Sequence, residues 1–406
     1  MDTVKITALY ADENGGIFDA PGVAAMGRSG KENIVLKKRD LILLPDDAVF
    51  MYLPGRMTLG QRNGEIIPIS GQAVAAVLPK EYIRGYLPSF YKEETAVQLP
   101  SYAYTAVGLY KEQIYAAALY TDEKKKTVRN SYDIEALNVS VKKVKNALPD
   151  NRLVCWLADC ALKQQEQATD LFYHRKVVTI PMSDAYNNTA CLGCDLISEE
   201  IQKPLNFIPT TEEITQIGIY YFEHVKDGIL NFGCGGNTDP ALMAEKLAAA
   251  IGKIREKTAG HINIRTNAGC TTGIAKLADA GLDSMTVDII SAVPENYQTY
   301  FNCNYELADV VKSLIYAREK GVVITLNMLY FPGFNDNKSE ALNWRKFLRK
   351  IPVDRICICD LNIDPDLFTR VMPMLDRALG TKMFFGGLKG EFSAIRIPQL
   401  FRYKNN

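Results

Sequence analysis

The sequence lacks an excess of charge of either sign. Its 406 residues include 47 lysines and arginines and 47 aspartates and glutamates, so the formal net charge at pH 7 is zero. A protein that binds nucleic acid through the phosphate backbone needs a broad basic field, and this composition does not provide one. We therefore expect no nucleic-acid partner. Hydrophobic and charged fractions of 47% and 23% indicate an ordinary folded protein rather than a disordered one.

Long hydrophobic runs are also absent. No stretch approaches the ~18 apolar residues that a membrane-spanning helix requires, and residues 1–7 lack the basic segment and apolar core of a secretory signal. The sequence therefore predicts a cytoplasmic protein without a membrane partner. Its length favours two or three domains, because a domain usually contains ~100–200 residues.

Histidine is scarce, and cysteine occurs in an odd number. The three histidines lie on different segments without the spacing of a metal site, so we assign them no role. Nine cysteines in a chain without a secretory signal argue against a disulfide framework, and any special cysteine should be a metal ligand or a reactive thiol. The others should pack, with Cys155 and Cys160 in a helix and Cys357 and Cys359 alternating with isoleucines in a strand.

The chain changes its pattern twice. Residues 1–125 contain short apolar runs broken by Gly, Pro, Asn and Asp, which predict small antiparallel strands and a β-rich accessory domain. Residues 126–174 are predicted to form a partly helical linking segment. Residues 175–365 repeat a strand, turn and helix pattern six times, and residues 366–406 form a C-terminal extension. The fold class that we expect is α/β, with a parallel sheet curled into a partial (β/α)6 TIM-like barrel.

Local signals mark the individual units of this barrel. The expected strands are residues 177–182, 228–233, 261–266, 284–290, 322–329 and 354–359. Thr210 and Glu213 form a capping box at the start of one helix, and Asp239 before Pro240 caps another. In such barrels the active site lies at the carboxyl ends of the strands, so the loops that follow them are the ones to examine.

The loop after the first barrel strand contains Cys191-Leu-Gly-Cys194. By spacing alone, this CxxC pair could be half of a zinc site, a redox pair or two inert thiols. Its place between a barrel strand and the following helix would project the thiolates into the barrel mouth. Iron–sulfur clusters are held by such thiolates.

At this loop the sequence resembles the radical S-adenosylmethionine (radical SAM) superfamily. The family loop is CxxxCxxC, and Asn187 stands where its first Cys belongs. Residues 232–242 resemble the family's Gly-rich segment, with Asp239 at the position of its Glu. Residues 265–268 resemble the TNG-type end of the third strand, and residues 280–287 resemble an AGLDSVRVS stretch. Residues 327–336 resemble the LPGxND ending of the fifth strand.

This resemblance implies a 4Fe-4S cluster and S-adenosyl-L-methionine as cofactors, with an electron donor for activity. The cluster ligands that it implies are Cys191 and Cys194, with Asn187 at the missing third position. The implied contacts to S-adenosylmethionine are Gly233, Gly235, Gly236, Asp239, Thr266, Asn267 and Asn327. The expected activity is generation of a 5′-deoxyadenosyl radical that abstracts hydrogen from an unidentified substrate, for which a protein or peptide is one candidate.

Asn187 is the main departure from the family pattern. A neutral amide is a poor ligand for iron beside thiolates. Tyr186, Cys234 or Cys270 could complete the ligand set, and the sequence does not rank them.

Other interpretations remain open. The chain could be a cluster-free barrel that acts as a binding or partner protein, or a CxxC zinc or thiol protein. Asp239 could serve only as a helix cap, the glycines could only permit a tight turn, and Thr266 and Asn267 could only satisfy the loop backbone.

Overall fold

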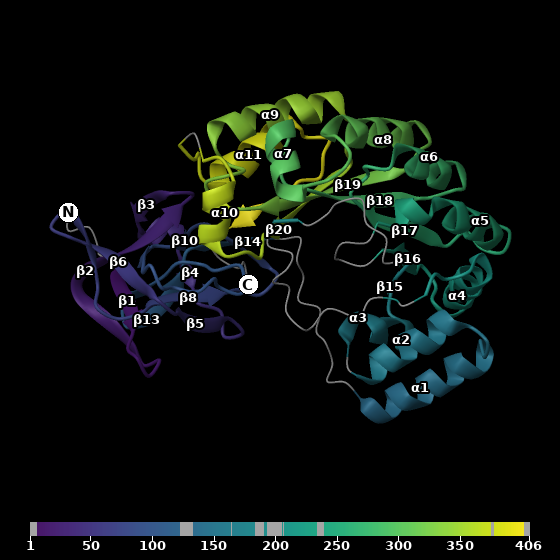
Figure 1. The fold of residues 1–406 in the computed structure, drawn as a ribbon, viewed down its shortest axis with the longest axis horizontal. Helices are drawn as coiled ribbons and strands as arrows, with labels where there is room; N and C mark the ends of the chain where they lie inside the picture. The colour runs from purple at the N-terminus through teal and green to yellow at the C-terminus, as the bar shows by residue number, and fades with distance from the viewer. Residues whose placement is uncertain are drawn as a thin grey trace.

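The computed structural model describes residues 6–121, 133–163, 165–182, 191–192, 205, 207–233, 239–374 and 377–401. Figure 1 shows three parts: a β-rich N-terminal part, a helical bundle of α1 to α3, and an α/β part between them. None of the helices in the described ranges has both the length and the apolar character needed to cross a membrane.

The N-terminal part is built from short antiparallel strands, as the sequence predicts. Most of them join one sheet with the path β11-β6-β2-β1-β12-β13-β4, while β5 pairs with β8 and β9 pairs with β14. The strands are β1 (Thr7–Ala11), β2 (Ile17–Ser29), β3 (Glu32–Val35), β4 (Ile42–Leu43), β5 (Val49–Leu53), β6 (Arg56–Arg62), β7 (Glu65–Pro68), β8 (Ala73–Val77), β9 (Tyr82–Arg84), β10 (Leu87–Pro88), β11 (Phe90–Lys92), β12 (Val107–Tyr110), β13 (Gln113–Ala116) and β14 (Ala118–Thr121). A 3-10 turn, η1 (Lys38–Asp40), precedes β4.

Three helices follow: α1 (Ile134–Ala147), α2 (Arg152–Leu162) and α3 (Glu166–Phe172). Side chains cap the first two, since Asp133 accepts a hydrogen bond from the N–H of Ala136 and Asn151 accepts one from the N–H of Val154. Cys160 is buried within α2, as expected, while Cys155 is only half-buried. The bundle packs on the first barrel strand through α3 and on the first barrel helix through α2.

Six parallel strands form the sheet of the barrel. They are β15 (Val177–Ile180), β16 (Ile229–Phe232), β17 (His261–Thr266), β18 (Ser284–Ile289), β19 (Val323–Tyr330) and β20 (Arg355–Asp360), and they pair in chain order. Every pairing is parallel, from β15 with β16 to β19 with β20. The six expected strands are confirmed to within two residues, and with them the partial (β/α)6 barrel.

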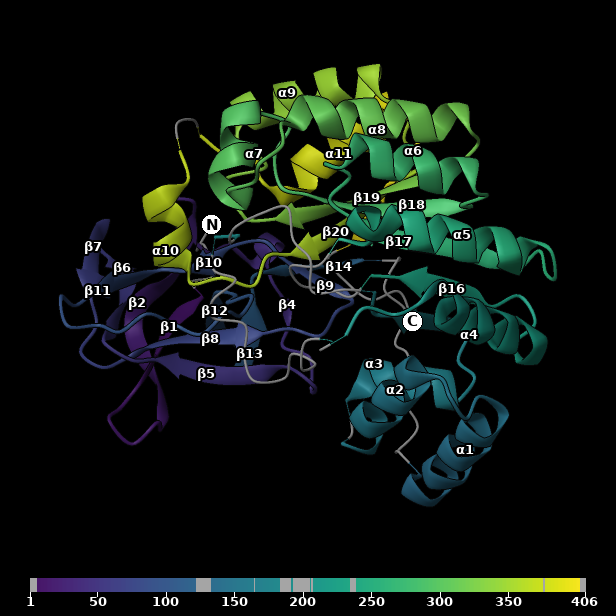
Figure 2. The ribbon, with the colours of Figure 1, turned by 45° about the vertical axis from the view of Figure 1, so that its right-hand side comes forward.

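Helices connect these strands and continue beyond them. They are α4 (Thr211–His224), η3 (Pro240–Met243), α5 (Ala244–Arg255), α6 (Thr271–Asp279), α7 (Pro294–Phe301), α8 (Leu307–Glu319), α9 (Lys338–Lys350), α10 (Pro365–Val371) and α11 (Thr381–Glu391). The capping box of Thr210 and Glu213 is present at the start of α4. Figure 2 shows α4, α5, α6 and α8 following one another along the outside of the sheet.

The barrel strands alternate between two faces. On β17, Ile262 and Ile264 are fully buried against the helices, whereas Asn263 and Arg265 are half-exposed. The other barrel strands repeat this alternation, so the outer face is apolar and the inner, concave face is largely polar.

Cys357 and Cys359 show the consequence for β20. The sequence predicted that both thiols pack within the strand, but Ile356 and Ile358 occupy the buried face. The two cysteines are therefore half-buried on the inner face of the barrel. A period of two places alternate residues on opposite faces, and the isoleucines, as the more apolar set, take the outer one.

Arginines of the N-terminal part dock it on the end of β20. The backbone N–H of Arg84 donates to Oδ2 of Asp360 at 3.0 Å, and its guanidinium donates to the carbonyl of Leu361 at 2.6 Å. Arg84 is completely buried. This contact lies at the carboxyl edge of the barrel sheet, because Asp360 is the last residue of β20.

A second arginine contact holds the start of α10. The guanidinium of Arg56 lies 3.3 Å from both Asp364 and Asp366, and the side chain of Arg56 is 0% exposed. Arg28 adds an ion pair with Asp366 at 3.2 Å. The N–H of Leu99 also donates to Asp364, at 2.7 Å. Charges buried in this way must be paired, so the cluster fixes the two parts of the chain against each other.

Backbone contacts extend this interface. The N–H of Gly30 donates to the carbonyl of Pro332 at 2.9 Å. Gly333, with φ of +87°, lies so close that a Cβ there would meet the nitrogen of Gly30 at 1.9 Å. The C-terminal strand β21 (Leu400–Phe401) pairs with β14, so the end of the described chain also returns to the N-terminal part.

The buried arginine cluster leads to a stability prediction. Arg56→Met should lower the free energy of unfolding by about 3–5 kcal/mol, because the carboxylate of Asp364 would stay buried without its cation. Urea denaturation would measure this. The matched control is Lys253→Met, since the Lys253–Glu212 pair is more than half exposed on both sides and should contribute less than about 1 kcal/mol. Equal effects of the two substitutions would contradict the prediction.

Candidate functional site

The inner face of the barrel carries a chain of hydrogen-bonded polar side chains across four strands. Asn231 donates to the hydroxyl of Thr179 at 3.1 Å, and Asn263 donates to the amide oxygen of Asn231 at 2.6 Å. Ser284 donates to Asn263 at 2.7 Å and contacts Nε2 of His261 at the same distance. This network of hydrogen bonds satisfies the polar side chains on this part of the inner face, and His261 has a structural role in it.

An ion pair stands closer to the carboxyl edge. Arg265 on β17 binds Asp288 on β18 through two nitrogens, at 2.9 and 3.0 Å. Asn327 on β19 donates to the same carboxylate at 2.6 Å. The arginine and aspartate side chains are 36% and 25% exposed, so the group borders the barrel interior. The sequence analysis selected Asn327 as a site residue but missed Arg265 and Asp288. The alternation of β17 and β18 could have found them, because Arg265 and Asp288 precede the outward-facing Thr266 and Ile289 and so lie on the inner face.

Asp239 connects the ends of β16 and β17. Its carboxylate accepts hydrogen bonds from the N–H of Ala241 at 2.8 Å and from the N–H of Asn267 at 2.9 Å. The hydroxyl of Thr266 lies 2.8 and 2.9 Å from its two oxygens. Burial raises the pKa of Asp239, and these hydrogen bonds act in the opposite direction. The predicted helix cap is present, and Thr266 and Asn267 are brought directly to Asp239.

Gly233 permits the close approach of these two strand ends. Its φ is +98°, and a Cβ at this position would meet the carbonyl oxygen of Arg265 at 2.6 Å. A side chain would therefore push β16 away from β17. Gly235 and Gly236, the other two glycines of the predicted cofactor loop, lie outside the described residues, as does Cys234.

The predicted cluster loop is described only at Cys191 and Leu192. Cys191 is half-buried and contacts the barrel core, and the N–H of Leu192 donates to the carbonyl of Tyr300 at 2.8 Å. Cys194, Asn187 and Tyr186 lie outside the described residues. Within the ranges that the structure describes, no three His, Cys, Asp or Glu side chains converge as a metal site would require.

A buried tyrosine pair lies behind these loops. The hydroxyls of Tyr297 and Tyr305 are 3.2 Å apart, and burial raises the pKa of both. Charges on Cys303 and Asp239 add to the shift of each tyrosine. The sulfur of Cys303, a buried thiol to which the sequence gave no signal, contacts the carbonyl of Tyr305 at 3.3 Å.

The Pro-Gly-Phe-Asn-Asp segment after β19 is a structural turn. The amide of Asn335 donates to the carbonyls of Ile290 and Leu329 at 2.6 and 3.1 Å, which ties the end of β18 to the end of β19. Asp336 accepts from the N–H of Gly333 at 2.6 Å. These side chains hold the rim of the barrel in shape.

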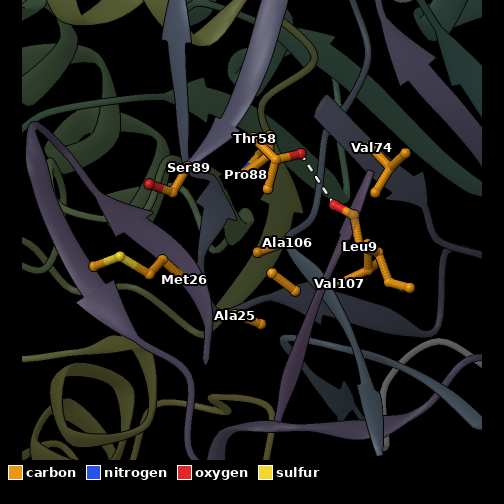
Figure 3. A pocket seen from close by; sticks show the side chains of 10 residues that line it. Leu9, Ala25, Met26, Thr58, Val74, Pro88, Ser89, Ala106 and Val107 are labelled. Carbon is orange, nitrogen blue, oxygen red and sulfur yellow. Dashed lines mark hydrogen bonds between the residues drawn. The ribbon is translucent and has the colours of Figure 1, made fainter. Parts of the chain in front are cut away.

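A small pocket in the N-terminal part offers no comparable chemistry. It is lined mainly by apolar side chains from β1, β2, β8 and β12 (Figure 3). Its two hydroxyl groups are occupied, since Thr58 donates to the carbonyl of Leu9 at 3.0 Å and Ser89 donates to Asn33 at 2.8 Å. The candidate site is therefore the carboxyl edge of the barrel.

Comparison with known proteins agrees with this choice. Residues 187–344 match the family model of the Radical SAM superfamily. The matched segment begins at Asn187 and includes the Asp239 loop, the Arg265–Asp288 pair and the turn at Asn335.

A curated relative covers part of the chain. GTP 3′,8-cyclase of Aquifex aeolicus (strain VF5) is 30% identical over 186 residues, which are 44% of this chain and 54% of the cyclase. The chain therefore spans about half the length of the curated relative that it matches.

Solved structures are similar at low identity. The structure of HydG, a maturase of the FeFe-hydrogenase, is 15% identical with a TM-score of 0.36, covering 66% of this chain and 63% of its own. Methylornithine synthase is 12% identical with a TM-score of 0.37, covering 66% of this chain and 76% of its own. The fold described here rests on the strand order of the chain itself.

The rim turn leads to a pH prediction. Burial raises the pKa of Asp336 to about 6, although the N–H groups of Gly333 and Gly380 and the hydroxyl of Tyr330 lower it. Because the folded-state pKa lies above the ordinary value of about 3.9, the contribution of this group to stability is full below about pH 4 and is lost as the pH rises through about 6.

Asp336→Asn should remove this dependence. Relative to the wild type, the variant should gain roughly 2–3 kcal/mol of stability between pH 4 and pH 7, since each unit of pKa shift is worth ~1.4 kcal/mol. Urea unfolding curves at several pH values would measure the difference. Parallel stability profiles for the two proteins would show that Asp336 does not titrate in this range.

Proposed function

We propose that this chain is a radical SAM enzyme that binds a 4Fe-4S cluster and S-adenosylmethionine at the carboxyl edge of its barrel. The supporting observation is the position of Cys191, which contacts the barrel core beside α7 and lies in the segment matched by the superfamily. Its thiol is only half-buried. A soft, partly accessible thiolate at this edge is the kind of donor that an iron–sulfur cluster requires.

The proposed contacts to S-adenosylmethionine surround the same edge. The Gly233 turn lets the end of β16 approach β17 closely, and Asn327 lies on the inner face with the Arg265–Asp288 pair. The carboxylate of Asp239 already accepts from three protein groups, so its main contribution is to hold the loops after β16 and β17 in place. We therefore infer that Asp239 supports S-adenosylmethionine binding by positioning these loops. Its carboxylate is not free to bind the ammonium group of the cofactor.

When bound, the two cofactors would supply a 5′-deoxyadenosyl radical that abstracts hydrogen from the substrate. The chain's own residues would orient the substrate and exclude water. The helices seal the outer face of the sheet, and the polar inner face offers hydrogen bonds toward the interior. The N-terminal part docks beside the ends of β19 and β20, where it could contact a protein or peptide substrate. An electron donor and a cytoplasmic location complete the proposal.

A cluster-free barrel is the second candidate, and Asn187 favours it. The family pattern places three cysteines in the loop, and this chain has two of them. Such a protein would bind a ligand or partner with the same polar face but would take up no iron. The zinc or thiol alternative predicts zinc in place of iron and sulfide.

The cluster can be tested through its thiols. After anaerobic reconstitution, the wild type should contain iron and sulfide and show iron–sulfur absorbance, and the double variant Cys191→Ala, Cys194→Ala should lose both, because the soft ligands are removed. Metal analysis and visible spectra would measure this. Cys160→Ala, at a buried thiol of α2, is the control and should retain the wild-type iron content. Full iron in the double variant would exclude this loop as the site.

Binding of S-adenosylmethionine can be tested separately. We expect calorimetry to detect binding to the wild type and weaker binding to Asp239→Ala, because the loops after β16 and β17 lose their shared carboxylate. Asp159→Ala, at an exposed position of α2, should bind as the wild type does. Absence of binding to well-folded wild-type protein under anaerobic conditions would favour the cluster-free candidate.

A further inference from the structure

Aromatic side chains gather around the turn between β1 and β2. Tyr10 and Phe18 are partners across this hairpin, and their ring centroids lie 5.8 Å apart. Tyr52, on β5, lies beside the same turn, because a Cβ at Gly15 would come within 3.3 Å of its ring. These three rings form the hairpin patch. Figures 1 and 2 show the hairpin projecting from the N-terminal part, away from the helices of the barrel.

The turn holds these rings in place and leaves them open to solvent. The carboxylate of Asp12 accepts hydrogen bonds from the N–H groups of Asn14 and Gly16, at 2.9 and 2.7 Å. Gly16 lies beside the ring of Phe18, which a Cβ at this position would approach at 3.1 Å. Phe18 is nevertheless 48% exposed, and Tyr52 is 44% exposed. Exposed aromatic rings that are held in place are typical of a binding surface, because they offer a large contact area at a low cost in conformational entropy.

The surroundings of the hairpin patch are acidic. The segments 8–20, 45–53 and 70–77 contain five aspartates and glutamates and no lysine or arginine. They lie next to one another, because β5 pairs with β8 and Ala11 bridges Gln72. The acidic residues are Asp12, Glu13, Asp19, Asp46 and Asp47, and each of them except Asp12 is exposed. In a chain without net charge, this concentration of one sign would attract a cationic partner and repel a nucleic acid.

A second aromatic pair in the N-terminal part shows what such rings can hold. The ring centroids of Tyr110 and Tyr115 are 5.7 Å apart, nearly the same separation as in the hairpin patch. Nζ of Lys38 lies 4.2 and 3.8 Å from these two centroids, where the ring faces attract its charge. In the part of the chain that the structure describes, no lysine or arginine lies over a ring of the hairpin patch.

We propose that the hairpin patch docks a basic segment of a peptide or protein partner. A lysine or arginine of that segment lies over Phe18 or Tyr52, as Lys38 lies over its tyrosine pair, and neighbouring cations of the segment pair with Glu13 and Asp19. This inference goes beyond the proposed function, because the surface lies outside the barrel and needs neither cofactor.

Fluorescence anisotropy with the full chain tests the role of the rings. The probe is a short labelled peptide of alternating glycine and lysine, which the wild type should bind more weakly as the salt concentration rises. Phe18→Ala should weaken binding by about two- to fivefold, the loss expected for one exposed cation–π contact, and Phe18→Tyr should bind as the wild type does. Tyr91→Ala is the matched control, since Tyr91 is 55% exposed on β11, outside the patch, and should leave the affinity unchanged.

The carboxylates can be tested with the same probe. The double variant Glu13→Gln, Asp19→Asn should weaken binding and reduce its dependence on salt, because two attractive charges are removed. Glu112→Gln, at an exposed carboxylate outside the patch, should bind as the wild type does. All of these side chains are at least half-exposed or nearly so, and we expect every variant to melt near the temperature of the wild type.

Three results would overturn the inference. The first is a wild type that binds the lysine peptide no better than the same peptide with glutamate in place of lysine. The second is an equal effect of Phe18→Ala and Tyr91→Ala. The third is a wild type that sediments as a dimer without peptide while Phe18→Ala sediments as a monomer, because the occupant of the patch would then be a second copy of this chain. Since no cofactor is added, none of these results depends on the cluster.

Discussion

The two-faced pattern of the six parallel barrel strands determines where the candidate side chains on those strands lie. Residues such as Ile264 and Val287 are fully buried against the helices, and the burial of this apolar face fixes the orientation of each strand. Their neighbours Arg265 and Asp288 must then point into the barrel, where they pair. A slip of one residue on β17 or β18 would place a charged side chain, Arg265 or Asp288, among the helices. The polar interior is thus a consequence of how the apolar outer face packs.

The buried arginine cluster adds a second constraint at the rim. Arg56 and Arg84 are completely shielded from solvent, so each must keep its acceptors at the end of β20 and the start of α10. The close packing of Gly30 against Gly333 adds a contact that only glycine allows. The N-terminal part therefore belongs to the same body as the barrel edge where the cofactors are proposed to bind, and Figure 1 shows it beside β20 and α10.

The segment at Cys191 is held by a contact that is distant in the sequence. The N–H of Leu192 donates to the carbonyl of Tyr300 in the last turn of α7. The position of this segment therefore depends on the packing of α7 as well as on the loop itself. The same helix contributes Tyr297, whose hydroxyl lies 3.2 Å from that of Tyr305.

The sequence by itself determined the six barrel strands, the capping box at Thr210 and the cap at Asp239, because these follow from local periodicity and short-range hydrogen bonds. Through its resemblance to family motifs it also drew attention to Thr266 and Asn327, which the structure places on β17 and β19. It could not reveal that the carboxylate of Asp239 binds Thr266 and Asn267, that Cys357 faces the interior, or that Leu192 binds Tyr300. Those arrangements join residues distant in the chain, and only the packing of strands and helices around one core decides which of them meet.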